Sequence, residues 1–472
     1  MATRDTTLPA DPLRAAIDQW TVGALATNML WTRCLGASAI AAAQRHRFAD
    51  LTRRVRERSP YYRQAWEHLP HTELRLADLP VVNKAGLMDA FDDWCTDRAV
   101  AWREVERFIH EQARIGERFL DRYIVWTSSG TTGTSGVFIQ DAAALAVYDA
   151  LVSVQLSGSA YADCDWSAVA AQGGRAALVT ADCDHFASIA SWRRVAHGKP
   201  WLDMKSIAVT LPLPEIVAKL NAYAPAFIAS YPTVLALLAD EQRAGRLRVR
   251  PAGLFAGGEA LSEAAHAAIE EAFGCCVQNE YGASECLTIG CGCREGWLHV
   301  NADWVILEPV DRDFRPTPPG ELSHTVLLTN LANAVQPIIR YDLGDRVRMH
   351  VGRCGCGSPL PAIQVEGRSD DVLTFRGRDG AMVKLPPLAL ATVVEEAARI
   401  YRFQIVQHAA EALVLRLSAS DRKRAGAPAL RALRQYLDRA GLAHIKLGFD
   451  EQEPQSDPRD GKLRQVVAWH GA

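Results

Sequence analysis

The sequence lacks a charge excess of either sign. Lysine and arginine number 52 and aspartate and glutamate number 55 among 472 residues, which gives a formal net charge of −3. Proteins that bind nucleic acid or anionic lipid through their overall charge carry a basic excess. We therefore expect no nucleic acid and no membrane as partners, and the true partners have to be inferred from individual sites.

Long uninterrupted apolar runs are also missing. The most apolar stretch, residues 20–43, contains Thr21, Asn28, Thr32 and Arg33, whereas a membrane span needs about 20 predominantly apolar residues. An amphipathic helix is the better interpretation. The N-terminal region has no basic segment followed by an apolar core and a small-residue cleavage site, which is the pattern of a secretory signal. The sequence thus predicts a cytoplasmic protein.

A disulfide framework is not expected either. The chain has 11 cysteines, an odd number, and large cytoplasmic proteins keep their thiols reduced. Free thiols and metal ligands are the expected roles. A serine hydrolase is disfavoured because the sequence has no Gly-x-Ser-x-Gly elbow.

The length of the chain is enough for about two to four domains. Short apolar runs at residues 176–180, 206–211, 226–229 and 253–256 alternate with helical patterns, which indicates parallel β/α layers. We predict an α/β fold with a large N-terminal domain of layered β-sheets and helices, residues 1–367. A small α+β C-terminal domain would follow, residues 368–472, because charge and glycine interrupt the apolar pattern near residue 366. Its expected elements are helices at 388–400 and 427–440 and strands at 404–407 and 412–417.

A loop rich in glycine and hydroxyl groups follows a short apolar run in YIVWTSSGTTGTSGVF, residues 123–138. Glycine permits backbone conformations that side chains forbid, and amide and hydroxyl donors suit phosphate oxygens. The loop is not a Walker loop, because Thr134, Ser135 and Gly136 stand where that motif needs Gly-Lys-Ser/Thr. Phosphate charge must then be met elsewhere. A solvated turn is the alternative.

Four separated motifs occur in a fixed order: SSGTTG at 128–133, AGGEALS at 256–262, NEYGASE at 279–285, and RYDLGD at 340–345 followed by GRSDD at 367–371. The ordered set resembles the adenylate-forming superfamily of acyl-CoA synthetases, nonribosomal adenylation domains and luciferases. The most similar branch is that of phenylacetate-CoA ligase-like proteins, which includes coenzyme F synthetase-like proteins. The resemblance extends over residues 48–467.

The resemblance implies a nucleotide site. The residues that would contact the ATP phosphates are Ser128, Ser129, Gly130, Thr131, Thr132 and Gly133. The residues that would lie on the adenine side are Gly258, Glu259, Ala260, Asn279 and Tyr281. Asp345 would bind the ribose hydroxyls, and Arg368 would support the nucleotide.

The same resemblance implies the catalytic groups. Ser284 would touch phosphate, Glu285 would hold Mg²⁺, Asp370 would be the hinge of a mobile C-terminal domain, and Lys462 would reach the reacting carboxylate and the α-phosphate. A carboxylate that attacks a phosphate needs such a cation and a hard metal ion, because both reactants are anions. A surface carboxylate and a solvated lysine are the alternatives. Many relatives have a lysine where this chain has Thr134.

A metal site is predicted from soft ligands. Five residues separate Cys293 from His299, and Cys354 and Cys356 form a Cys-x-Cys pattern. Three thiolates and an imidazole make a tetrahedral zinc set with no position for water, which indicates structural Zn²⁺, and similar patterns in the phenylacetate-ligase-like branch suggest the same pairing. Cys286 and Cys291 are competing ligands, and unrelated thiols are the alternative.

The acyl pocket of the family lies between residues 180–260 and the NEYGASE segment. The candidate lining residues are His185, Phe186, Ser230, Tyr231, Ala256 and Ala283. This mixture suits an aromatic or compact carboxylic acid, although core packing explains each residue equally well.

The resulting hypothesis is an ATP-dependent acid:CoA ligase that works in two half-reactions. An acyl-adenylate forms first, and the C-terminal domain then rotates about Asp370, withdraws Lys462 and admits the thiol of CoA. An acyl-carrier protein or an amine could replace CoA. A noncatalytic nucleotide-binding protein held together by zinc is the alternative from another class.

Overall fold

The computed structural model describes residues 12–70, 74–128, 136–156, 166–182, 184–198, 202–366, 372–378, 380–400, 402–455 and 464–468. Within these ranges no helix is both long and apolar enough to span a membrane.

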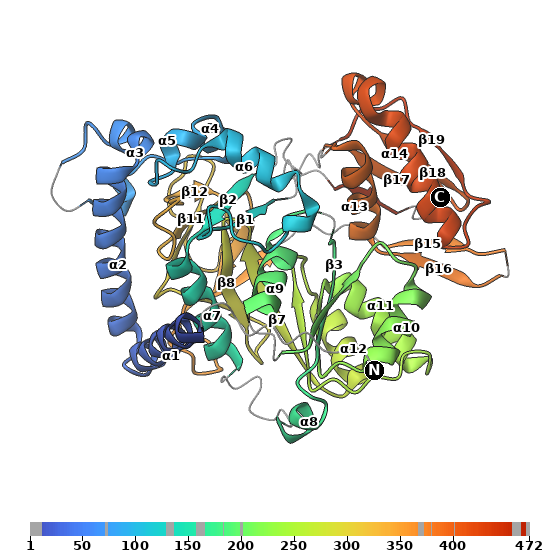
Figure 1. Cartoon of the computed structure of the whole chain (residues 1–472), viewed down its shortest axis with the longest axis horizontal. Coiled ribbons are helices and arrows are strands. Elements are labelled where there is room, and N and C mark those ends of the chain that lie inside the picture. The colour runs from blue at the N-terminus through green and yellow to red at the C-terminus, as the bar shows by residue number, and fades with distance from the viewer. Residues whose placement is uncertain are drawn as a thin grey trace.

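The N-terminal region consists of helices that flank the rest of the large unit (Figure 1). They are α1 Pro12–Cys34, α2 Ala37–Arg58, α3 Pro60–Ala65, η1 Leu76–Asp78, α4 Lys84–Asp89, α5 Phe91–Trp94, α6 Trp102–Ile109 and η2 Gln112–Arg114. Gly36, with φ 88°, separates α1 from α2. Ser59 then ends α2 and caps α3, since its hydroxyl accepts the Tyr62 amide hydrogen at 3.4 Å and Pro60 occupies the first helical turn.

A nine-stranded sheet forms the centre of the large unit, in the order β13-β14-β9-β8-β7-β6-β5-β3-β4. Its strands are β3 Ala176–Thr180, β4 Met204–Ala208, β5 Phe227–Ser230, β6 Gly253–Gly257, β7 Cys276–Ala283, β8 Cys286–Gly292, β9 Leu298–Val300, β13 Arg346–Met349 and β14 Ala362–Glu366. Strands β3 to β7 are parallel, and β8, β9, β14 and β13 are joined in antiparallel pairs. The predicted β/α alternation is therefore confirmed.

Helices and two smaller sheets complete the large unit. The helices are α7 Ala142–Leu156, α8 Trp166–Ala171, α9 Ala187–Gly198, α10 Leu213–Tyr223, α11 Pro232–Arg243 and α12 Glu263–Phe273. The strands of the small sheets are β1 Ile124–Thr127 and β2 Val137–Gln140, and β10 Val305–Val310, β11 Thr325–Asn330 and β12 Tyr341–Asp342.

The described residues after 371 form a separate C-terminal unit beside α10 and α11 (Figure 1). Its elements are β15 Leu373–Arg376, β16 Met382–Leu385, α13 Pro387–Ala398, β17 Gln404–Ala409, β18 Ala412–Arg416, α14 Ala419–Arg439, β19 Lys446–Phe449 and β20 Val466–Val467. No strand of this unit joins the nine-stranded sheet in the described part. The prediction that the last helix begins at residue 427 was wrong: α14 starts at Ala419, because Ser418 caps it by accepting the Asp421 amide hydrogen at 3.1 Å.

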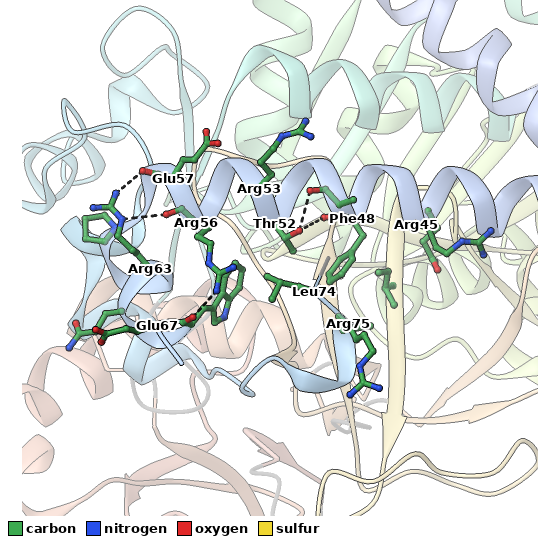
Figure 2. A pocket seen from close by; sticks show the side chains of 17 residues that line it. Arg45, Phe48, Thr52, Arg53, Arg56, Glu57, Arg63, Glu67, Leu74 and Arg75 are labelled. Atoms are coloured by element: carbon green, nitrogen blue, oxygen red, sulfur yellow. Dashed lines mark hydrogen bonds between the residues drawn. The ribbon is translucent and has the colours of Figure 1, made fainter. Parts of the chain in front are cut away.

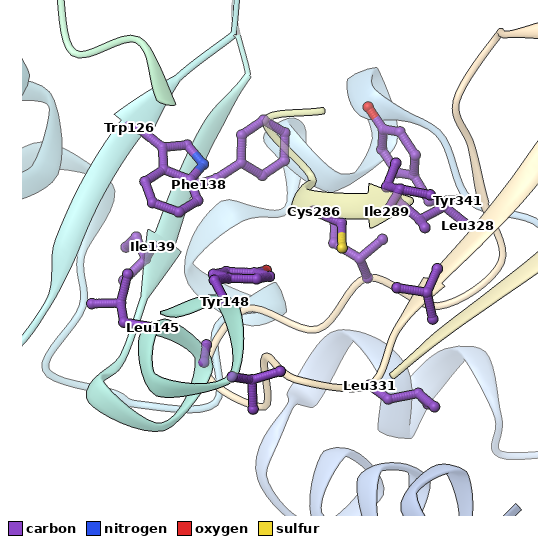
Figure 3. Close-up of a cluster of buried hydrophobic side chains, with 14 of the residues drawn as sticks. Trp126, Phe138, Ile139, Leu145, Tyr148, Cys286, Ile289, Leu328, Leu331 and Tyr341 are labelled. Carbon is purple, nitrogen blue, oxygen red and sulfur yellow. The ribbon is translucent and has the colours of Figure 1, made fainter. Parts of the chain in front are cut away.

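A buried cluster connects the β1/β2 hairpin to the central sheet (Figure 3). Trp126 of β1 is 0% exposed and Tyr148 of α7 is 1% exposed. Their ring centroids are 6.3 Å apart. Burial of one such side chain contributes about 1.5–3 kcal/mol relative to exposure. The cluster therefore holds the start of the glycine-rich loop firmly against β8, β11 and β12.

A run of arginines lies in the last two turns of α2. Such a charge run is usually a solvated helix face, but Arg56 is an exception. Its guanidinium is half-buried and donates to the carbonyl oxygens of Trp66 at 2.8 Å and Leu69 at 2.9 Å. Figure 2 shows this region, a groove of about 1370 Å³ along α2 and α3. None of the predicted site residues lines it, so the groove is not part of the candidate active site.

Candidate active site and metal cluster

The base of the glycine-rich loop is closed by two hydrogen bonds. The Ser128 amide donates to the Gly136 carbonyl at 2.8 Å, and the Gly136 amide donates to Ser128 Oγ at 2.8 Å. A Cβ at Gly136 would lie 2.7 Å from the Phe138 ring, so only glycine fits there without a shift. Ser128 and Gly136, the described residues on either side of the loop, are thus held together.

The turn of the NEYGASE motif lies against this loop base. Trp126 Nε1 donates to the Ser284 carbonyl oxygen at 2.7 Å, and Ser284 Oγ donates to the Thr127 carbonyl oxygen at 3.4 Å. A Cβ at Gly282 would approach the Leu287 carbonyl oxygen to 2.0 Å, so the turn between β7 and β8 requires glycine. Two motifs separated by about 150 residues in the chain therefore meet in space.

Glu285 is buried and oriented by a tyrosine from a third motif. Tyr341 OH donates to Glu285 Oε1 at 2.6 Å, and Asn330 Nδ2 donates to the Glu285 carbonyl oxygen at 3.0 Å. Burial raises the pKa of Tyr341 and the Glu285 carboxylate raises it further, so the phenol remains a donor. The arrangement presents a fixed carboxylate, the kind of oxygen ligand that Mg²⁺ takes.

Tyr281 and Asp345, predicted on the adenine and ribose sides, are also in contact. Tyr281 OH donates to Asp345 Oδ2 at 2.9 Å. Burial, and then the Asp345 carboxylate, raise the pKa of Tyr281. Tyr281 lies on β7 together with Asn279, so one strand leads from the predicted adenine contacts to Ser284 and Glu285.

The AGGEALS motif enters the site through β6, which pairs with β7 at Ala256 and Asn279. Gly258 follows with φ 81°, and a Cβ there would lie 3.1 Å from the Tyr231 ring. Glu259 Oε2 accepts from the amide and hydroxyl of Thr233 at 3.1 and 2.7 Å. Ligands of open α/β sheets bind beyond the carboxyl ends of parallel strands, which is where this turn lies.

The predicted acyl-pocket residues have mixed surroundings. Tyr231 OH is 2.7 Å from Thr180 Oγ1 at the end of β3, Ala256 is fully buried, and Ala283 is partly exposed. His185 is completely buried beside Phe108, and its Nε2 lies 3.2 Å from the Glu111 carbonyl oxygen. Burial lowers the pKa of His185. These contacts favour core packing for His185, and its substrate role stays a prediction.

Several predicted residues lie outside the described part of the chain. They are Ser129, Gly130, Thr131, Thr132, Gly133, Arg368, Asp370 and Lys462. The predicted domain boundary at 367/368 falls there too. Their roles remain predictions.

The structure brings together the four predicted zinc ligands. The ligand atoms of Cys293, His299, Cys354 and Cys356 all lie within 4.8 Å of one another. Cys293 Sγ is 3.8 Å from Cys354 Sγ, and His299 Nε2 is 3.1 Å from Cys356 Sγ. Neither competing ligand, Cys286 or Cys291, belongs to this group.

The cluster is suited to a cation. His299 Nδ1 lies 3.0 Å from the Leu360 carbonyl oxygen, a contact that holds the hydrogen on Nδ1 and leaves the Nε2 lone pair for a metal. Burial lowers the pKa of His299 and raises the pKa of the Cys293 thiol to about 12. A bound cation would offset the cost of forming thiolates there.

Sequence reasoning missed three residues that shape the site. Tyr341 orients Glu285, Thr233 holds Glu259, and Lys84 Nζ donates to Ser128 Oγ at 3.3 Å. Tyr341 stands inside the RYDLGD motif, which is a visible signal, and Lys84 is the first residue of α4, after the N-cap Asn83. Thr233 follows Tyr231 without any such pattern.

Comparisons with known proteins bear on this geometry. No family model matches the chain. The CapK protein of Staphylococcus aureus is 26% identical over 135 residues, which is 28% of this chain and 28% of that protein. The chain thus matches less than a third of that curated relative's length.

Solved structures of 2-hydroxyisobutyryl-CoA ligase are similar over most of the chain. In the postadenylation state with R3-HIB-AMP, that ligase is 20% identical, with 92% of this chain and 90% of that chain covered and a TM-score of 0.51. The chain has the fold of the adenylate-forming ligases. The structure of 2-hydroxyisobutyryl-CoA ligase in an open conformation, with 2-HIB-AMP and CoA, is 19% identical to this chain, with 91% of each chain covered and a TM-score of 0.50. The predicted α/β fold with a C-terminal domain is confirmed.

Proposed function

We propose that this protein is an AMP-forming ligase that activates a carboxylic acid with ATP and transfers the acyl group to CoA. The observation that carries the proposal is the convergence of three motifs. Ser284 contacts the base of the glycine-rich loop at Thr127, and two residues of the RYDLGD motif contact the NEYGASE motif, because Tyr341 donates to Glu285 and Asp345 accepts from Tyr281. An adenylation reaction needs this combination of phosphate donors, a metal ligand and ribose contacts.

Within this proposal ATP and CoA are substrates, and Mg²⁺ would be held by Glu285. Mg²⁺ supplies charge neutralisation at the phosphates when bound. The chain itself orients the Glu285 carboxylate through the hydrogen bond from the Tyr341 hydroxyl. The proposed acid is aromatic or compact, the proposed branch is that of phenylacetate-CoA ligase-like proteins, and the proposed compartment is the cytoplasm.

One assay tests which acceptor receives the acyl group after adenylation. The protein is incubated with ATP, Mg²⁺ and a panel of aromatic and short-chain carboxylic acids, and CoA, a phosphopantetheinylated carrier protein or an amine is then added. Mass spectrometry is expected to detect acyl-CoA with one or more acids. Acyl transfer to carrier protein or amine, with none to CoA, would contradict the proposed acceptor.

The C-terminal unit is proposed to be the mobile domain, with its boundary at 367/368 and its hinge at Asp370. Two ion pairs join it to the large unit: Lys384 Nζ to Asp240 Oδ2 at 2.6 Å and Arg399 Nη1 to Asp184 Oδ2 at 2.8 Å. The partners are between 15% and 45% exposed, so solvent screens each pair and each contributes less than about 1 kcal/mol. Buried apolar side chains of both units also belong to one hydrophobic cluster. Reorientation during turnover would therefore have to break the ion pairs and separate part of this apolar contact.

Reversal of one of these charges tests the mobility. Arg399→Glu places two carboxylates together and is expected to change the ratio of the adenylation and thioester-forming rates by about three- to tenfold. The measurement compares single-turnover acyl-AMP formation with thiolysis of supplied acyl-AMP. Arg439→Glu, an exposed position on α14 of the same unit, serves as the matched control. An unchanged ratio in Arg399→Glu would contradict a role for this contact in domain orientation.

We also propose that the Cys3His cluster holds one structural Zn²⁺. It would connect the segment after β8 to the loop between β13 and β14. Strand β14 then leads to the proposed hinge. Four protein ligands leave no place for a reacting water, so the proposed contribution is to stability rather than to chemistry.

Metal content tests the cluster. Wild-type protein is expected to contain about one zinc per chain, and Cys354→Ser to lose most of it and to unfold at a lower temperature, because zinc binding contributes folding free energy. Cys291→Ser, a neighbouring thiol outside the cluster, should keep its zinc. Equal zinc in wild type and Cys354→Ser would remove Cys354 from the site, and wild type without zinc after purification in the absence of chelators would refute the metal.

A further inference from the structure

The glycine-rich loop has no lysine of its own. Thr134 stands where many adenylate-forming proteins have a lysine, and Ser135 stands where the Walker loop has its lysine. Backbone amides and hydroxyls can donate hydrogen bonds, but they do not neutralise the charge of a triphosphate. A cation from another part of the chain at the base of this loop would neutralise phosphate charge that Mg²⁺ leaves uncompensated.

Lys84 is in the right place. Its Nζ donates to Ser128 Oγ at 3.3 Å, and Ser128 is the residue at which the loop begins. Ser128 Oγ also accepts the Gly136 amide hydrogen at 2.8 Å, so the ammonium group lies where the two ends of the loop come together. The Lys84 side chain is half-buried, which makes its charge less screened than that of a fully exposed lysine.

Hydrogen bonds fix the chain both before and after Lys84. On one side, the Val82 amide donates to the Arg340 carbonyl oxygen at 3.1 Å and the Asp342 amide donates to the Val82 carbonyl oxygen at 2.8 Å. The residue enclosed by this bridge, Tyr341, is the one that orients Glu285.

On the other side, Met88 Sδ of α4 accepts the Val137 amide hydrogen at 3.5 Å. Val137 is the first residue of β2, directly after the loop. Helix α4 is thus attached both to the strand that orients the proposed Mg²⁺ ligand and to the strand that receives the loop. The position of Lys84 is set by the fold and not by a flexible tail.

We propose that Lys84 binds the β- and γ-phosphates of ATP, and the pyrophosphate that leaves, in place of the lysine that the loop lacks. A compact ammonium group with three donors suits non-bridging phosphate oxygens, and it can keep its contact with Ser128 while it donates to an anion. The proposal rests on the proposed function, because it requires nucleotide phosphates at this loop.

The test measures binding rather than turnover. Isothermal titration calorimetry of the full chain with Mg²⁺-pyrophosphate and with Mg²⁺-ATP is compared for wild type, Lys84→Met, Lys84→Arg and the control Lys219→Met, an exposed lysine on α10. Loss of one charge-assisted contact is expected to raise both dissociation constants of Lys84→Met by about ten- to a hundredfold. Lys84→Arg should recover part of the affinity, and Lys219→Met should match wild type. Thermal unfolding establishes that each variant is folded.

The outcomes separate the two levels of the proposal. If wild type and Lys84→Met bind both ligands with equal affinity, Lys84 does not contact the phosphates and this inference is overturned, while the proposed function stands. If wild type binds neither ligand, the proposed function fails and the role of Lys84 fails with it. A weaker Lys84→Met with an unchanged Lys219→Met supports both.

Discussion

Lys462→Ala is expected to slow acyl-adenylate formation by about a thousandfold and to leave thiolysis of supplied acyl-adenylate within about threefold of wild type. The resemblance to adenylate-forming enzymes implies that this lysine would lie beside the carboxylate and the α-phosphate in the first half-reaction, which is the role that this prediction tests. Two anions must approach each other in that step, and a fixed cation stabilises the charge that gathers between them. The second half-reaction consumes a mixed anhydride that is already formed, so it does not need that cation.

The measurement for Lys462 treats the two half-reactions separately. Acyl-AMP formation is followed in a single turnover, and thiolysis is started from synthetic acyl-AMP with CoA. Lys446→Ala, an exposed lysine on β19 of the same unit, is the matched control. Equal losses in both half-reactions would show that Lys462 acts through folding or domain orientation, and no loss in either would remove it from the active site.

Glu285→Gln is expected to lower the rate of adenylation by about a hundredfold or more and to raise the Mg²⁺ concentration needed for half-maximal rate. Glutamine preserves the shape of the buried side chain and can still accept the Tyr341 hydroxyl, so the change removes charge with little change in packing. The free energy of unfolding should therefore stay close to that of wild type, although Glu285 is only 6% exposed.

Tyr341→Phe is the matched comparison for Glu285. It keeps the carboxylate and removes the 2.6 Å hydrogen bond that orients it, so we expect a smaller loss, about tenfold, since one neutral donor is worth about 1–1.5 kcal/mol. The assay is a Mg²⁺ titration of pyrophosphate release. A Glu285→Gln protein with wild-type rate and wild-type Mg²⁺ dependence would show that the carboxylate binds no metal, and a larger loss in Tyr341→Phe than in Glu285→Gln would assign the essential role to the tyrosine.

The parts of the fold that depend on local patterns could be predicted from the sequence. The alternation of short apolar runs and helical patterns predicted the parallel strands β3, β5 and β6, because strand and helix periodicities differ along the chain. The C-terminal helix α14 was predicted to begin too late. Its N-cap at Ser418 is a local signal that lies nine residues before the predicted start, and Pro428 lies inside the helix.

Part of the candidate site could likewise be predicted from the sequence, and part could not. The Cys3His cluster could be predicted although about 60 residues separate its halves, since four soft ligands in two short pairs limit the alternatives. The pairing of Glu285 with Tyr341 and of Ser128 with Lys84 could not be predicted, because each joins segments that only tertiary folding brings together. Arg56 shows the reverse case: its sequence context is that of a solvated helix face, and only the fold places carbonyl oxygens around it.

The most direct test of the central claim is carboxylate-dependent exchange of labelled pyrophosphate into ATP. This exchange reports adenylation alone and does not depend on the identity of the acceptor or on release of a product. With a panel of aromatic and short-chain acids, we expect exchange with at least one acid, dependence on Mg²⁺, and loss in both Lys462→Ala and Glu285→Gln. Binding of Mg²⁺-ATP without exchange for any acid of a broad panel, by folded protein of full zinc content, would contradict the account and favour a noncatalytic nucleotide-binding protein.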